Sequence, residues 1–118
     1  METKELLLDA YSHIRRIVHQ AADGLSVEQL VYRPEEGSNS IAWLVWHLTR
    51  IEDSHLSAVT QLDGAWSTDG WDDRFGLGGT TSIGFGDGPE EVAALRPEGD
   101  LLLGYHDYVN GRVLSYMD

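Results

Sequence analysis

Cysteine is absent from the 118-residue sequence, and basic residues are scarce. Without cysteine, the chain can form neither disulfides nor thiolate metal ligands, and any thiol chemistry needs an external thiol. Lys and Arg number 8 against 20 Asp and Glu, which gives a formal net charge of −12. Because binding to a phosphate backbone requires basic residues that displace counterions, we expect no nucleic-acid partner.

Long apolar runs and a basic leader are also missing. No stretch reaches the roughly 18 consecutive apolar residues that a membrane helix needs, so we expect no membrane partner. The N-terminal segment contains Glu2, Glu5 and Asp9 where a secretory signal would be basic and then apolar. The sequence therefore predicts a cytoplasmic protein. Its length and 42% apolar content fit a single globular domain over residues 1–118.

Residues 40–62 form the most apolar segment of the chain and predict a long helix. Asn39 or Ser40 would cap its first turn, and Gly64 would end it in a left-handed conformation. Apolar residues recur there at three- and four-residue steps, which predicts one buried face. That face comprises Ile41, Leu44, Leu48, Ile51, Val59 and Leu62.

Two histidines lie on this helix and need separate explanations. His47 and His55 are eight residues apart, about 12 Å along a helix axis, which is too far to share a metal. His55 falls within the apolar face, and His47 lies at its edge. Each can be a partly buried histidine with one hydrogen-bond partner. Alternatively, His47 is a metal ligand that is joined by ligands from a facing helix.

The flanking segments predict further helices. Residues 2–22 form an amphipathic helix with His13 at the edge of its apolar face and His19 on the opposite, solvent-exposed face. Ser26 and Gln29 have the spacing of a capping box, which starts a short helix that ends before Pro34.

The C-terminal part predicts two more helices. Pro89 begins a short helix that ends at Arg96. Asp100 would cap a helix over residues 101–117, with His106 at the edge of its apolar face.

The segment 64–88 is irregular and holds eight of the 13 glycines. It is no phosphate-binding loop, because no Gly-Lys-Ser/Thr follows its glycines and its aspartates would repel an anion. Two interpretations stay open for its aromatic residues. They anchor the segment as a lid over the open end of a helical bundle, or they pin an ordinary surface loop. The residues concerned are Trp66, Trp71, Phe75 and Phe85.

The run of residues 40–53 resembles the second-helix signature of the DinB/YfiT superfamily of bacterial helical bundles. It has a small polar cap (Ser40), an apolar stretch with tryptophans, His47-Leu48 and a charged segment that ends at Asp53. The resemblance implies an all-α, up-and-down four-helix bundle. It also implies that His47 is one of three ligands to a divalent metal, zinc or nickel, with the other two on the fourth helix.

The chain ends at Asp118, about where the third helix of that family finishes. We therefore expect three main helices with short helices and a long glycine-rich loop, truncated before helix four. The exposed groove left by a missing helix, together with the resemblance, favours a homodimer.

Three functional hypotheses follow. The resemblance implies a metal-dependent enzyme, a thiol S-transferase or isomerase that acts on a small-molecule substrate with a low-molecular-weight thiol such as mycothiol. The alternative is a non-catalytic bundle that binds a small apolar ligand or a partner chain. A third hypothesis joins His13, His47 and His106 as a metal-ligand set from three helices.

Overall fold

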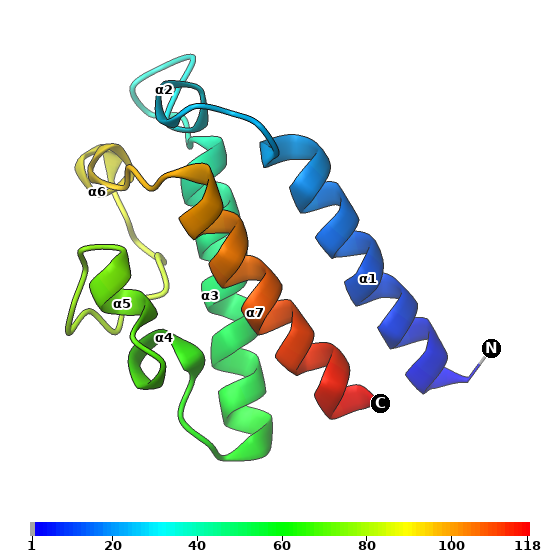
Figure 1. Ribbon diagram of the computed structural model, residues 1–118. Coiled ribbons are helices and arrows are strands. Elements are labelled where there is room, and N and C mark those ends of the chain that lie inside the picture. Colours follow the sequence, from blue (N-terminus) through cyan, green and yellow to red (C-terminus); the bar gives the residue numbers. More distant parts are fainter. Residues whose placement is uncertain (1) are drawn as a thin grey trace.

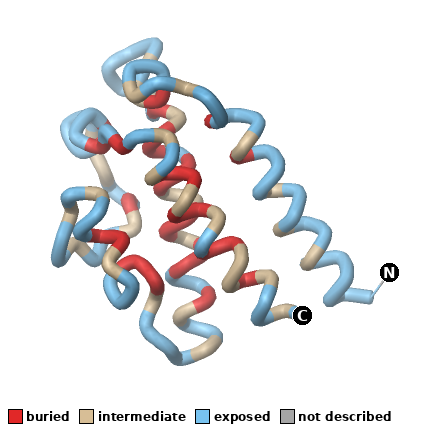
Figure 2. Tube along the Cα trace, in the orientation of Figure 1, coloured by how far each residue is buried: buried red, intermediate tan, exposed pale blue. Residues whose placement is uncertain are grey.

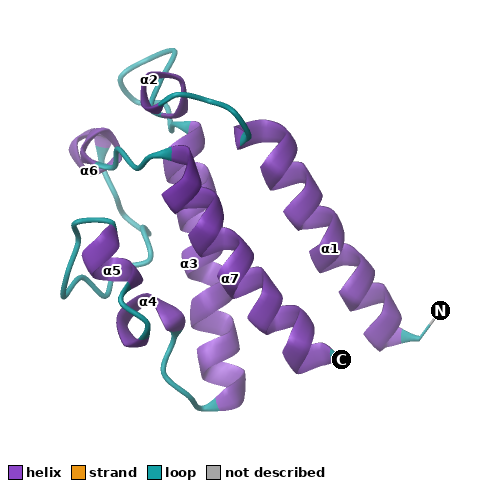
Figure 3. Cartoon of the chain, in the orientation of Figure 1, coloured by secondary structure: helices purple, strands orange, loops and turns teal. Residues whose placement is uncertain are grey.

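Three long helices dominate the structure, a computed structural model that describes residues 2–118 (Figure 1). They are α1 (Thr3–Ala22), α3 (Ile41–Thr60) and α7 (Gly99–Met117). The last of these, α7, packs along both α1 and α3, whereas α1 and α3 meet over a much smaller area. The described residues are helix and loop without any strand, so the all-α bundle is confirmed (Figure 3).

Four short helices complete the part of the chain that the structure describes: α2 (Val27–Leu30), α4 (Ala65–Thr68), α5 (Trp71–Arg74) and α6 (Pro89–Ala94). The capping box before α2 is confirmed, because the Ser26 hydroxyl accepts from Gln29 N–H and the Gln29 side chain accepts from Ser26 N–H. The glycine-rich segment is less irregular than predicted, since α4 and α5 both form within it.

The ends of α3 and α7 partly correct the sequence analysis. Ser40 caps α3, and its hydroxyl accepts from Trp43 N–H at 3.0 Å. The helix ends earlier than predicted, at Gln61 with a φ of 61°, instead of at Gly64. The N-cap of α7 is Glu98, and Asp100 lies in the first turn. A carboxylate there still interacts favourably with the positive end of the helix dipole.

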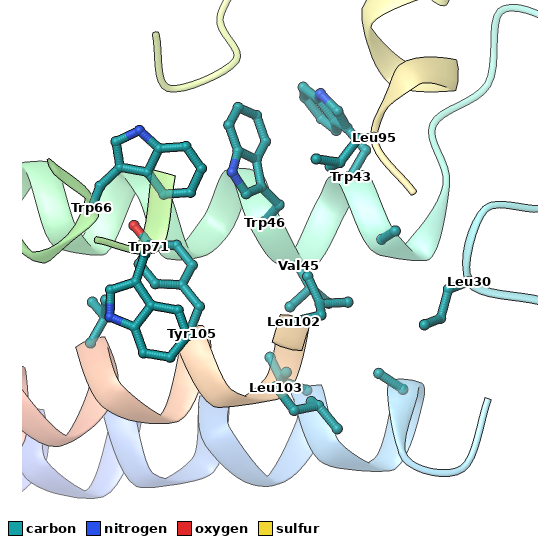
Figure 4. Packing of buried hydrophobic residues seen from close by; sticks show 14 of the residues in the cluster. Leu30, Trp43, Val45, Trp46, Trp66, Trp71, Leu95, Leu102, Leu103 and Tyr105 are labelled. Atoms are coloured by element: carbon teal, nitrogen blue, oxygen red, sulfur yellow. The ribbon is translucent and has the colours of Figure 1, made fainter. Parts of the chain in front are cut away.

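The core lies between α3, α7 and the short helices, and large aromatic side chains fill much of it (Figure 4). Trp66 and Trp71, from the glycine-rich segment, are 2% and 8% exposed. Both rings pack on Tyr105 of α7 with centroids 5.4 Å away. The aromatic residues of this segment therefore anchor it to the bundle, although Phe75 is only partly buried and Phe85 is exposed.

The predicted apolar face of α3 is confirmed only at Ile41 and Leu48, which are partly buried against the core. Leu44, Val59 and Leu62 are 50%, 62% and 63% exposed. The buried face lies roughly a quarter turn or more away and includes polar side chains; its members are Ala42, Val45, Thr49, Asp53 and Leu56. The helix is apolar on both faces, and the face that packs is the one whose polar groups find partners in α4 and α7.

The apolar face predicted for α1 is covered only along one edge. Val18 and Ala22 are buried, but Leu6 and Ile17 remain 57% and 47% exposed. Figure 2 shows α1 as largely exposed beside the buried contact of α3 with α7. Apolar surface on α1 and α3 is thus left uncovered. None of the helices described has the length and hydropathy that a membrane crossing requires.

His19 packs toward α7, contrary to the expected solvent-facing position. Its Nε2 lies 2.8 Å from Asp107 Oδ1, and its Nδ1 lies 3.1 Å from Asp23 Oδ1. The hydrogen bond to Asp107 is the main reason why the pKa of His19 is raised, with a smaller contribution from Asp23. Protonated His19 therefore holds α1 against α7.

This pair predicts a pH-dependent contribution to stability. A histidine with a raised folded-state pKa stabilises the fold below its unfolded pKa of about 6.5 and loses that effect as pH rises through the folded pKa. We expect His19→Gln to lower the free energy of unfolding in urea at pH 5.5 and to change it much less at pH 8.5. His13→Gln, in an exposed position on the same helix, is the control. An equal effect of His19→Gln at both pH values would contradict the account.

Candidate functional site around His47

Residues 80–87, called here the 80–87 segment, run along one side of α3 and are fastened there by four side chains. Each of the four donates a hydrogen bond to a carbonyl or carboxylate of the segment. The pairs are Trp66 Nε1 to Thr80 O (2.7 Å), Arg50 Nη2 to Thr81 O (3.0 Å), His47 Nδ1 to Ile83 O (2.5 Å) and Trp43 Nε1 to Asp87 Oδ2 (2.9 Å). The segment is therefore a fixed wall of the site.

The imidazole of His47 is held in one orientation. It stacks on Trp43 with a centroid distance of 4.5 Å and an interplanar angle of 20°. The edge contact with Phe85 is at 5.0 Å and 88°. Because the Ile83 carbonyl can only accept, Nδ1 carries the proton and Nε2 of the neutral ring carries the lone pair. Within residues 2–118, no hydrogen bond reaches that Nε2.

Gly84 allows the segment to approach His47 this closely. Its φ is +102°, and a Cβ built there would lie 2.8 Å from His47 Nδ1. The same Cβ would lie 3.0 Å from Trp46 and 3.1 Å from Trp43. Only glycine accepts both this backbone conformation and these contacts without a shift.

Asp53, six residues beyond His47 on α3, organises the adjacent elements. It is 1% exposed, and its carboxylate accepts from the backbone N–H groups of Ala65 and Trp66 at 2.9 and 2.8 Å. The Tyr105 hydroxyl donates a third bond at 2.9 Å, and burial raises the pKa of this phenol well above its usual range. Asp53 thus connects α3, α4 and α7.

Arg50 links this cluster to the 80–87 segment. Its guanidinium lies 4.7 Å from the ring centroid of Trp66, a cation–π contact, and 3.9 Å from the Asp53 carboxylate. It also donates to the carbonyls of Thr81 and Ser82. The residue is 6% exposed, so its buried charge is paired with Asp53 and hydrogen-bonded to two backbone carbonyls.

A mostly apolar pocket of about 280 Å³ borders the same segment. Trp43 and Trp46 form part of its wall, and Leu77 and Leu95 contribute further apolar surface. Trp43 belongs both to this pocket and to the stack on His47. A small apolar molecule in the pocket would therefore lie one aromatic ring away from the imidazole.

The other histidines lie apart from His47. His13 is exposed and contacts Arg16, and His55 is exposed as well. His106 is fully buried, with Nδ1 at 3.0 Å from Thr49 Oγ1, and burial lowers its pKa to about 4. His106 is therefore neutral near pH 7.

The structure does not assemble the predicted three-histidine set. No group of three or more His, Cys, Asp or Glu side chains in the described part of the chain is arranged to hold a metal ion. His13, His47 and His106 each have a separate partner on a different part of the bundle, which is the physical reason for this correction.

Sequence reasoning found His47 but missed the residues that hold it. Arg50 and Asp53 are two opposite charges three residues apart inside an apolar helix. Such charges are seldom buried unless they are paired, so the pair was a signal that this face packs.

The family model described as the DinB superfamily matches residues 10–118. A conserved protein from Enterococcus faecalis, solved by crystallography, is 25% identical and superposes with a TM-score of 0.88. The match covers 100% of this chain and 71% of that chain. None of the curated proteins matches the chain.

Proposed function

Since the chain belongs to the DinB superfamily, we propose that it acts as a divalent-metal-dependent enzyme in which His47 supplies one ligand to zinc or nickel. One observation carries the proposal: His47 donates its Nδ1 proton to the Ile83 carbonyl. Metal-binding histidines usually have this arrangement, because the outer hydrogen bond fixes the ring and leaves the other nitrogen for the metal.

The described residues supply one ligand to such a metal. His47 offers an oriented Nε2, but the described chain holds no complete ligand set. The proposal therefore needs further ligands from protein groups outside the described residues. Leu44 and Ile51 lie one turn on either side of His47, and the exposure of Leu44 leaves this side of the helix accessible.

The proposed reaction is the transfer or isomerisation of a small substrate with a low-molecular-weight thiol such as mycothiol. A bound divalent cation lowers the pKa of a thiol and so favours the nucleophilic thiolate. The chain's own contribution is to fix the imidazole and to provide the apolar pocket beside Trp43 for the substrate's carbon skeleton. With no cysteine in the sequence, the thiol would come from outside.

The test is metal content per chain after equilibration with zinc or nickel, measured by elemental analysis. It is made on the 118-residue chain and on the polypeptide with any natural residues that follow. We expect one metal per chain where the further ligands are present, and loss of that metal in His47→Ala. His55→Ala, two turns further along the same helix, is the matched control and should keep the metal. Equal metal content in His47→Ala and the parent would contradict the proposal.

A second candidate function is a non-catalytic bundle that binds an apolar ligand or a partner chain, including a second copy as a homodimer. The exposed apolar side chains on α1 and α3 favour it, notably Leu6, Leu44 and Val59. Exposed apolar surface can mark an interaction site. A protein whose stability and ligand binding are unchanged by chelation and by His47→Ala would support this candidate.

A further inference from the structure

Glu52 is the buried acid without a partner among the residues described. Its side chain belongs to a residue only 6% exposed, yet neither carboxylate oxygen has a hydrogen-bond partner there. The other buried acids differ: Asp53 accepts three hydrogen bonds, and Asp72 accepts from the backbone N–H of Asp73 and of Gly79. A buried polar group without a partner costs free energy, and a ligand that donates hydrogen bonds to this carboxyl group would remove that cost.

Glu52 lines a cleft of about 260 Å³. The start of α1 and the end of α7, which both contribute to the cleft, lie at the same end of the bundle (Figure 1). All three long helices contribute to its wall, which is mainly apolar and aromatic. Its members include Leu7, Tyr11, Leu56, Val59 and Tyr116. His55 also lines the cleft, and among the described residues no Lys or Arg does.

The surroundings leave the charge of Glu52 uncompensated. Burial alone raises the pKa of this carboxyl group to about 7, and no cationic side chain offsets the effect. A ligand that brings a positive charge with N–H donors would satisfy both oxygens, and charge-assisted hydrogen bonds are the stronger kind. The chain's net charge of −12 favours the approach of cations and disfavours anions.

We propose that this cleft binds a small primary amine with an apolar or aromatic carbon group, whose ammonium donates hydrogen bonds to Glu52. The volume lies just below the range of about 300–1,000 Å³ for pockets of drug-sized ligands, so the molecule is small. The apolar walls accept its carbon skeleton. His47 does not line this cleft, so the proposal stands apart from the metal hypothesis.

Calorimetric titration of the 118-residue chain with phenethylamine at pH 8 tests the proposal. We expect saturable binding at one site per chain. The neutral analogue 2-phenylethanol, which has the same carbon skeleton, should bind roughly tenfold more weakly or worse. Glu52→Leu should weaken the binding of the amine to a similar degree. Glu28→Gln removes an acidic charge from a side chain that is 79% exposed and should change nothing.

A second measurement uses the wild-type chain, so it does not depend on whether the Glu52→Leu variant folds. Met117 lines the cleft, and its methyl signal in the NMR spectrum of the wild-type chain should shift with the amine and saturate. The proposal is overturned if the amine does not saturate, if the alcohol binds equally well, or if Glu52→Leu binds the amine normally. A dimer in sedimentation that occupies the cleft and is unaffected by the amine would also overturn it.

Discussion

Asp53→Ala is expected to lower the free energy of unfolding by about 3–5 kcal/mol, the range for removing one partner of a buried charged network. The substitution leaves two backbone N–H groups of α4 and the Tyr105 hydroxyl without their acceptor. It also removes the carboxylate nearest to the buried guanidinium of Arg50. Few single changes in this chain would leave so many buried donors unpaired.

Urea denaturation followed by circular dichroism measures this effect. Asp63→Ala, at an exposed position just past the end of α3, is the matched control and should change stability by less than about 0.5 kcal/mol. Asp53→Asn keeps one acceptor oxygen and should fall between the two. A loss below about 1 kcal/mol in Asp53→Ala would show that Asp53 does not hold α4 and α7 together.

Gly84→Ala is expected to cost about 2–4 kcal/mol, because it combines a positive φ with a close contact. The new methyl group would lie 2.8 Å from His47 Nδ1 and 3.0 Å from Trp46. The 80–87 segment must then move away from α3, so the bond from His47 to Ile83 should break. Chemical denaturation gives the stability loss, and the NMR shifts of the His47 ring report the broken bond.

Gly86→Ala is a closely matched control for this substitution. Gly86 has a φ of +85°, but a Cβ there meets nothing within 4 Å. We expect it to show only the backbone strain, about 1–2 kcal/mol, with His47 undisturbed. If both variants lose the same stability and leave the His47 signals unchanged, then the close approach of Gly84 to His47 does not matter for the site.

Local sequence signals predicted the helices well because their physical causes are local. The capping box of Ser26 and Gln29 needs only residues three apart, and it forms as predicted. Ser40 likewise caps α3 through a bond within its own first turn. The resemblance carried by the run around His47 added the bundle architecture, and the family match over residues 10–118 confirms it.

The packing face of α3 could not be obtained in the same way. Apolar periodicity placed Leu44 and Val59 inside, but the buried face carries Thr49 and Asp53. Those polar groups are buried because His106, Tyr105 and α4 supply partners from distant parts of the chain. Apolar periodicity considers only the apolar side chains of one helix and carries no information about hydrogen-bond partners from other helices.

The contacts of the 80–87 segment could not be predicted from the sequence either. Its carbonyls are bonded by Arg50, His47 and Trp66, which are at least 14 residues away in sequence. Glycine content suggested an irregular loop, but only the structure shows that Gly84 lets this loop touch the imidazole.

The tautomer of His47 is the most direct test of the central claim that its Nε2 is presented to a metal. Long-range ¹H–¹⁵N correlation spectra at neutral pH distinguish protonated from unprotonated ring nitrogens. The account predicts a protonated Nδ1 and an unprotonated Nε2, and the Nε2 signal should move first when zinc is added. A protonated Nε2, or a zinc response that leaves His47 unchanged, would contradict the account.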